Sequence, residues 1–168
     1  DTVYWDDAGA AFLYRQMPWD DDNWQHDIRA VRPCLADTQR IEMPFDTGPH
    51  ASFGRDVAHD GTSAIIGDPY AVDEDGTPSG WVAFLYRSSS SSDWTTLTEK
   101  DVVLPDDIQD WAYFGASVDI DGDFAIIGSP GHNSDMGRAV VMQKGGSGWD
   151  VAVELNGFVS GSRFGWDV

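Results

Sequence analysis

The chain is a succession of short apolar runs, four to eight residues long, separated by clusters of Gly, Asp, Asn, Ser and Pro. Residues 64–67 and 125–128 are continuously apolar, as in inner strands covered on both faces, whereas residues 94–98 alternate like an outer strand with one solvated face. No stretch carries the 3.6-residue periodicity of a long amphipathic helix. The pattern therefore predicts an all-β protein.

These runs belong to a repeat that begins with the pattern F-G-x-[DS]-V. The pattern occurs at residues 53–57, 114–118 and 164–168, so its copies are 61 and 50 residues apart. The sequence A-I-I-G follows ten residues or so downstream of the first two copies, and A-F-L-Y-R-type strands and a Trp follow in turn. The residues that mark the repeat, and that we expect to be structural, are Phe53, Gly54, Gly67, Phe114, Gly115, Gly128, Phe164 and Gly165.

Four antiparallel strands in a unit of 50 to 60 residues are typical of a β-propeller blade. A β-sandwich is the rival fold, but it predicts alternating strands without such a repeat. The spacing divides the chain into a partial blade with third and fourth strands (1–52), two complete blades (53–113 and 114–163) and the first strand of a further blade (164–168). Because propellers close with about four to eight blades, we expect a fragment of a larger propeller or one that other chains complete.

The repeat resembles the FG-GAP family, whose blades build the integrin α-chain head and many secreted or surface proteins. Residues 113–131 contain both halves of the name, F-G at 114–115 and the G-A-P-like sequence G-S-P at 128–130, and the copy at 53–69 ends in G-D-P. The resemblance covers nearly the whole chain and is weakest over residues 16–50. It implies a propeller used in adhesion, ligand binding or extracellular assembly, with occasional attachment to enzymes.

The net charge narrows the choice of partners. Acidic residues outnumber basic ones by 29 to 10, which gives a net charge of −19. Such a surface repels nucleic acid and anionic membranes, and no apolar run approaches the roughly 18 residues of a membrane-spanning helix. The charge favours solubility in salt-rich water, so we expect an extracellular or cell-surface location. The single cysteine, Cys34, allows no internal disulfide.

Calcium is the one cofactor that the sequence raises. Asp119, Asp121 and Asp123 alternate in the way that directs oxygens at one hard cation. The glycine and the distal acid that would complete such a site after Asp123 are missing, and a tight D-G turn explains the same residues without metal. The turn is favoured, no cofactor is required, and a Ca²⁺ site at these three residues is the alternative.

Motifs of nucleophilic, metal-dependent or phosphate-binding catalysis are absent from the sequence, so we do not expect an enzyme. Tryptophan, with eight copies, is the more informative residue. Some of these side chains either pack between blades or contact a sugar or a protein partner. The candidates for such contacts are Trp5, Trp81, Trp111 and Trp166.

Together these features predict a non-enzymatic, extracellular β-propeller segment for adhesion, scaffolding or assembly. Its partner would be another protein or further copies of the same chain, with glycan as a further ligand class. Two alternatives stay open: a Ca²⁺-dependent or carbohydrate-binding, lectin-like module, and the propeller portion of a larger secreted hydrolase.

Overall fold

The computed structural model describes residues 11–14, 38–41, 52–72, 76–89, 92–95, 98, 101–104, 107 and 109–168. In the first two of these ranges it describes the backbone, together with the side chain of Ile41. Trp5 and Cys34, which the sequence singles out, lie outside the described residues.

The first four-stranded sheet is a simple antiparallel meander. Its strands are β3 (Val57–His59), β4 (Ser63–Asp68), β5 (Trp81–Tyr86) and β6 (Val102–Val103), and they lie side by side in that order. The central strand β4 is the A-I-I-G run, and every residue in it is buried. A continuous apolar run covered on both faces is what an inner strand requires.

The second sheet repeats this arrangement. Its strands β7 (Val118–Asp121), β8 (Phe124–Ser129), β9 (Arg138–Lys144) and β10 (Trp149–Asn156) again lie in sequence order and are antiparallel. A single turn, α2 (His132–Asp135), precedes β9. The pairing register between β9 and β10 shifts between Val151 and Val153, as in a β-bulge.

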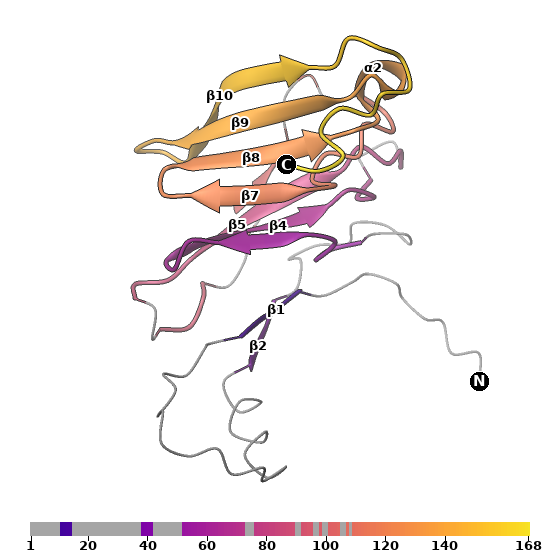
Figure 1. The fold of residues 1–168 in the computed structure, drawn as a ribbon. Coiled ribbons are helices and arrows are strands. Elements are labelled where there is room, and N and C mark those ends of the chain that lie inside the picture. Colours follow the sequence, from indigo (N-terminus) through magenta and orange to yellow (C-terminus); the bar gives the residue numbers. More distant parts are fainter. Residues whose placement is uncertain are drawn as a thin grey trace, which may run out of the picture.

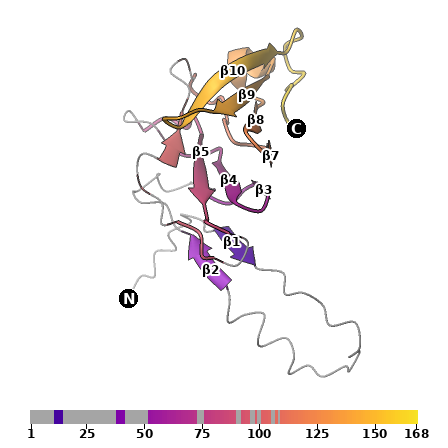
Figure 2. The same cartoon turned by 90° about the vertical axis from the view of Figure 1, so that its left-hand side faces the viewer.

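The sheets are stacked as layers (Figures 1 and 2), with the second sheet on one side of the first and a two-stranded pair, β1 (Ala11–Tyr14) and β2 (Thr38–Ile41), on the other. The all-β prediction is confirmed: two four-stranded antiparallel sheets contain most of the strand residues in the described part of the chain. They are consistent with propeller blades, and they do not form a closed ring. The sheets span residues 57–103 and 118–156, inside the limits given above for the two complete blades.

One strand differs from the sequence-based expectation. The outermost strand of the first sheet is β6, not a strand at Trp94. Thr95 still donates its backbone N–H to the Tyr86 carbonyl oxygen at 2.8 Å, but the ladder pairing with β5 falls on the β-branched pair at 102–103. Trp94 is buried, and the Arg87 guanidinium lies 4.3 Å from its ring centre. Its apolar ring is therefore used for packing.

The larger core lies between the two four-stranded sheets. Phe84 of β5 and Trp149 of β10 stack with ring centres 4.4 Å apart and an interplanar angle of 12°. The Trp149 indole N–H also donates a 2.6 Å hydrogen bond to the Tyr86 hydroxyl oxygen. The rest of this core is apolar: Ile65, Val82, Phe114, Val118, Ile120, Ala125, Ile127, Val140 and Met142. Aromatic stacking and apolar burial therefore join the sheets.

A second core covers the other face of the first sheet. There Phe53 packs with Ile66 and Leu85, and Ile41 of β2 joins the same cluster. Phe53 and Phe114 thus occupy equivalent places, one on each face of the first sheet. The third member of the series, Phe164, is 43% exposed on the far side of the second sheet.

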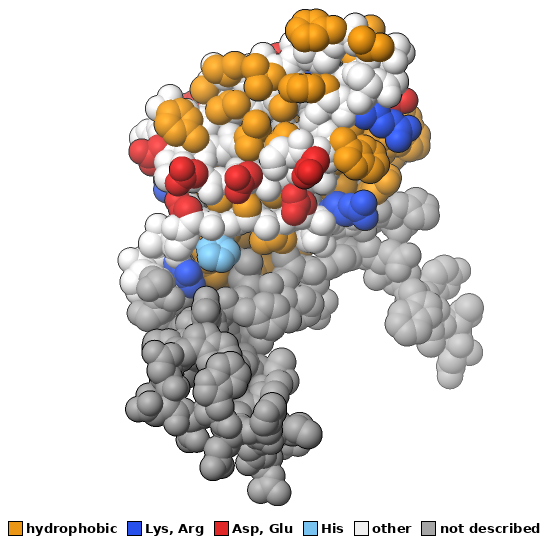
Figure 3. Space-filling view, viewed as in Figure 1, with side chains coloured by type: hydrophobic (Ala, Val, Ile, Leu, Met, Phe, Trp, Pro, Cys, Tyr) orange, Lys and Arg blue, Asp and Glu red, His pale blue; other side chains and the backbone are white. Residues whose placement is uncertain are grey.

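That far side of the second sheet is an exposed apolar face. Phe124, Val153 and Leu155 are 50%, 49% and 42% exposed, and the cross-strand pairs place Ile126 opposite Val141 on the same face. Figure 3 shows hydrophobic side chains over β8–β10 and acidic ones in a band along β7. Because Ile126 and Val141 correspond in the repeat to core residues of the first sheet, this face has the character of a surface that a further sheet covers.

Candidate functional site: the inter-blade pocket

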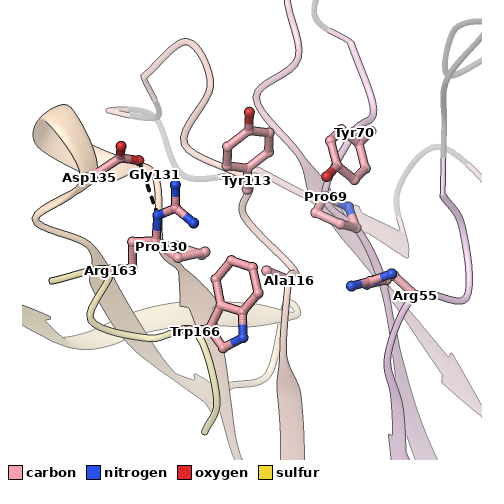
Figure 4. Close-up of a pocket in the computed structure, with 10 residues that line it drawn as sticks. All are labelled: Arg55, Pro69, Tyr70, Tyr113, Ala116, Pro130, Gly131, Asp135, Arg163 and Trp166. Atoms are coloured by element: carbon pink, nitrogen blue, oxygen red, sulfur yellow. Dashed lines mark ion pairs between the residues drawn. The ribbon is translucent and has the colours of Figure 1, made fainter. Parts of the chain in front are cut away.

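A cavity of about 310 Å³ opens at one end of the two sheets, where β4 and β8 end (Figure 4). We call it the inter-blade pocket. Its described lining is Arg55, Pro69, Tyr70, Tyr113, Ala116, Pro130, Gly131, Asp135, Arg163 and Trp166.

The repeat explains why these residues meet. Arg55, Ala116 and Trp166 are the third residue of the three F-G-x sequences, and Tyr113 and Arg163 immediately precede the F-G pairs of the last two copies. The backbone therefore repeats while the side chain at each pocket position changes. Such a lining is typical of a scaffold that presents variable binding groups.

Backbone contacts between successive repeats fix the pocket wall. The Phe114 N–H donates to the Ser79 carbonyl oxygen, and the Phe164 N–H donates to that of Met136, both at 3.0 Å. Close approach makes glycine necessary beside these bonds, because a Cβ at Gly67 would collide with the Gly115 carbonyl oxygen. The glycines of the repeat thus let one F-G segment lie directly on the preceding sheet.

The fourth position of F-G-x-[DS]-V also has a structural explanation. The Asp56 carboxylate accepts a 2.8 Å hydrogen bond from the Val118 N–H in the next repeat. Ser117, the equivalent of Asp56, accepts a 3.2 Å hydrogen bond through its hydroxyl oxygen from the Val168 N–H. The side chain at this position therefore links each F-G segment to the following one.

Backbone strain is concentrated around the pocket. The non-glycine residues with positive φ in the described part of the chain are Trp111 (60°), Tyr113 (56°), Asn133 (51°), Ser134 (59°), Asp135 (62°) and Arg163 (52°). Three of them line the pocket, and the other three lie within two residues of a lining residue in the sequence. Left-handed backbone costs an L-residue about 1–2 kcal/mol, and such strain clusters at functional sites. The arrangement marks this end of the sheets as the candidate site.

The charges and rings of the pocket are arranged in pairs. Nε of Arg163 lies 4.0 Å from an Asp135 carboxylate oxygen, and its guanidinium carbon lies 5.7 Å from the Trp166 ring centre. Tyr70 and Tyr113 meet edge to face with ring centres 5.3 Å apart. Burial, with smaller contributions from Tyr70 and Asp135, raises the pKa of the Tyr113 hydroxyl. Tyr113 is therefore a neutral hydrogen-bonding group at physiological pH.

A buried arginine lies on the strand next to α2. The Arg138 side chain is 0% exposed, and its Nη1 donates to both carboxylate oxygens of Asp107 at 2.8 and 2.9 Å. The same nitrogen lies 3.3 Å from a Glu154 oxygen. Hydrogen bonding to Arg138 lowers the pKa of Asp107, and burial followed by the Arg138 charge lowers the pKa of His132. Arg138 thus links β9 to Glu154 of β10 and to the segment at Asp107, next to the pocket.

A family model described as the FG-GAP repeat matches residues 97–142. Residues 97–142 form an FG-GAP repeat. The match contains both marks of that name, Phe114–Gly115 and Gly128–Pro130, and so confirms the resemblance noted from the sequence. No curated protein matched the chain.

The FG-GAP repeat contributes Tyr113, Ala116, Pro130, Gly131 and Asp135 to the inter-blade pocket. This repeat is typical of β-propeller-type modules for protein–protein interaction. Among the described residues, no helix has both the length and the apolar character that crossing a membrane requires.

The tryptophans proposed from the sequence fall in different places. Trp166 lines the pocket and is 60% exposed, and Trp111 is 55% exposed beside Tyr113, with ring centres 6.4 Å apart. Trp81 is partly buried at the start of β5. Because Trp81 pairs with Asp68 at the end of β4, the structure brings three of the four candidates to the pocket end of the sheets, and their role as ligand contacts stays a prediction.

The acidic alternation does not form a cluster in the described chain. Asp119 and Asp121 lie exposed on β7, and Asp123 follows Gly122 in the turn to β8. One Asp119 carboxylate oxygen accepts the Ile120 N–H at 2.9 Å. Nowhere in the described ranges do three His, Cys, Asp or Glu side chains gather closely enough to hold a metal ion. A Ca²⁺ site at these residues stays a prediction.

The sequence did not single out the two arginines or the two tyrosines of the pocket. The signal was present, because each of Arg55, Tyr113 and Arg163 adjoins an F-G pair or occupies its third position. These positions carry different residues in each copy, so they are disregarded when the conserved positions of the repeat are used to define the fold. Only the stacking of the sheets shows that they share one cavity.

Proposed function

We propose that the chain is a non-enzymatic module that binds protein partners through the inter-blade pocket, in adhesion, scaffolding or assembly of a surface structure. The observation that carries the proposal is the convergence in one pocket of variable positions from three repeats with strained residues. Strained backbone needs rigid support, and the inter-sheet core supplies it. The FG-GAP repeat supports a role in protein contact.

The chemistry of the pocket supports binding rather than catalysis. Its described lining contains one carboxylate, Asp135, and two arginines, and has no histidine, serine or cysteine. A nucleophile activated by a neighbouring base needs a pair of such groups within hydrogen-bond reach. The lining instead combines flat aromatic rings with guanidinium groups, which are enriched at the centres of protein interfaces.

The extracellular part of the proposal is supported by charge. A net charge of −19 keeps the chain soluble in salt-rich surroundings and disfavours nucleic acid and anionic membranes as partners. A contact module on a surface needs both properties.

A bead-adhesion assay tests this function. Beads coated with the protein are counted on cells of the source organism and on beads that carry the same chain, with albumin-coated beads as the baseline. We expect Trp166→Ala to lower adhesion to the baseline. Phe158→Ala is the matched control, because Phe158 is 94% exposed and does not line the pocket. Adhesion of the unaltered protein no greater than that of albumin, or equal adhesion of both variants, would contradict the proposal.

A further inference from the structure

Two arginines approach the inter-blade pocket from opposite sides, Arg55 from the first F-G-x sequence and Arg163 from the position just before the third (Figure 4). Within the described part of the chain, the Arg55 backbone N–H donates to the Ser52 carbonyl oxygen at 2.8 Å, whereas no hydrogen bond or ion pair engages the Arg55 guanidinium. Arg163 meets Asp135 only through Nε, at 4.0 Å. An arginine without a carboxylate partner is unexpected in a chain whose acids outnumber its bases by 29 to 10. The guanidinium groups are therefore available to a ligand.

Aromatic rings form the walls between these two charges. Tyr70 and Tyr113 pack edge to face on one side, and Trp166 lies near Arg163. Ring faces of this kind accept a flat or apolar group, and the Tyr113 hydroxyl stays protonated and able to donate a hydrogen bond. The pocket thus has an anion-binding part and an apolar part.

The backbone holds these groups in place before any ligand arrives. Tyr113 and Arg163, at equivalent positions of two repeats, both have left-handed φ. The Arg163 N–H donates to the Asp135 carbonyl oxygen at 2.9 Å, and the Ala116 N–H donates to the Tyr113 carbonyl oxygen at 3.1 Å. Fixing in advance the backbone that carries these two side chains reduces the entropy lost on binding.

Charge restricts the ligand further. A cationic side chain would meet two guanidinium groups. A polyanion or a dianionic phosphate would meet Asp135 at the rim and the field of a chain with net charge −19. A single carboxylate suits the planar donor pairs of arginine, and a cavity of about 310 Å³ has the size of a small-ligand site.

We propose that the inter-blade pocket binds an acidic peptide segment of a partner protein, with an Asp or Glu carboxylate between Arg55 and Arg163 and a neighbouring aromatic side chain against the tyrosines and Trp166. The proposal rests on the proposed function, because it names the chemistry that the same site recognises.

The test uses capped dipeptides as probes and NMR titration of the protein as the readout, followed at the Ala116 and Gly131 amides. We expect the Phe-Asp peptide to bind at least about tenfold more tightly than the Phe-Asn peptide, because a charge-assisted hydrogen bond is lost. Three further probes represent the competing ligand classes: Phe-Lys for a cation, Phe-phosphoserine for a dianion and glucuronate for a sugar acid. Because the change is made in the ligand, folding of a variant does not enter this comparison.

Variants of the protein locate the contact. Arg55→Gln and Arg163→Gln are each expected to weaken Phe-Asp binding by about tenfold. Arg87→Gln removes the same charge at the opposite end of the first sheet, where Arg87 packs over Trp94, and is expected to leave binding unchanged.

Several outcomes overturn the ligand class: equal binding of Phe-Asp and Phe-Asn, tighter binding of any other probe, or equal effects of all three arginine variants. If the ligand class fails while Trp166→Ala still abolishes bead adhesion, the proposed function stands and only the acidic peptide is wrong. If Trp166→Ala also leaves bead adhesion unchanged, both proposals fail.

Discussion

The repeated phenylalanines allow the stacking of the sheets to be tested by a matched pair of substitutions. Phe114 is 0% exposed in the core between the sheets, whereas Phe164 occupies the equivalent position of the next repeat and is 43% exposed. Phe114→Ala removes a fully buried ring and leaves a cavity, which costs about 3–5 kcal/mol. Phe164→Ala loses roughly half of the transfer free energy of a phenylalanine and leaves no closed cavity, which costs about 1–1.5 kcal/mol.

Equilibrium unfolding in urea, followed by tryptophan fluorescence, measures the difference. With a slope of about 2 kcal/mol per molar urea, Phe114→Ala is expected to lower the midpoint by about 2 M and Phe164→Ala by about 0.5 M. Equal shifts for the two variants would refute the reasoning, because they would show that Phe114 is not enclosed by a second sheet.

Three further substitutions test the inter-repeat contacts and the pH response. Asp56→Ala removes the acceptor of the Val118 N–H, so hydrogen exchange at that amide is expected to accelerate, with a loss of about 1–2 kcal/mol in the free energy of unfolding. Gly67→Ala places a methyl group against the Gly115 carbonyl oxygen, and an overpacked contact of this kind costs about 1–3 kcal/mol in thermal or urea unfolding. Burial lowers the pKa of His132 below its ordinary value of 6.5. The unfolded chain therefore takes up this proton first, stability is lost as the pH falls from 6.5 through the folded pKa, and His132→Gln is expected to flatten the melting temperature between pH 7 and pH 5.

The two predictions on inter-repeat contacts each have a control in the chain. Ser117→Ala is expected to accelerate exchange at the Val168 amide and to leave the Val118 amide protected. Gly146→Ala meets no atom within 4 Å and is expected to leave the unfolding midpoint unchanged. An unaltered Val118 amide in Asp56→Ala, or equal midpoints for the two glycine variants, would contradict the inter-repeat contacts. If His132→Gln leaves the pH dependence of the melting temperature unchanged, protonation of His132 does not contribute to stability in this range.

The sequence predicted the parts of the fold that repeat. The A-I-I-G runs gave β4 and β8 because a strand covered on both faces needs continuous apolar residues. The strand at Trp94 was wrong because β6 lies eight residues later, at Val102–Val103. In a window of five residues, a loop with one buried aromatic ring has the same alternation of apolar and polar residues as an outer strand. Only the hydrogen-bonded pairing with β5 shows which segment is the strand.

The candidate site was less accessible to sequence reasoning than the fold. Trp166 was singled out by its residue type alone. Arg55 and Arg163 were missed because they lie 108 positions apart and share a cavity only after two sheets have stacked. The strain at Tyr113 and Arg163 has no sequence signature either, since positive φ is favoured by glycine, and both are bulky residues.

The most direct test of the central claim is a nuclear Overhauser measurement between the Trp149 indole and the Phe84 ring. These rings belong to different sheets and stack with centres 4.4 Å apart. Two blades packed through this core predict a strong cross-peak between them, which Phe84→Leu removes. Cross-peaks from Trp149 to residues of its own sheet alone would show that the sheets do not stack, and would contradict the architecture and the pocket built on it.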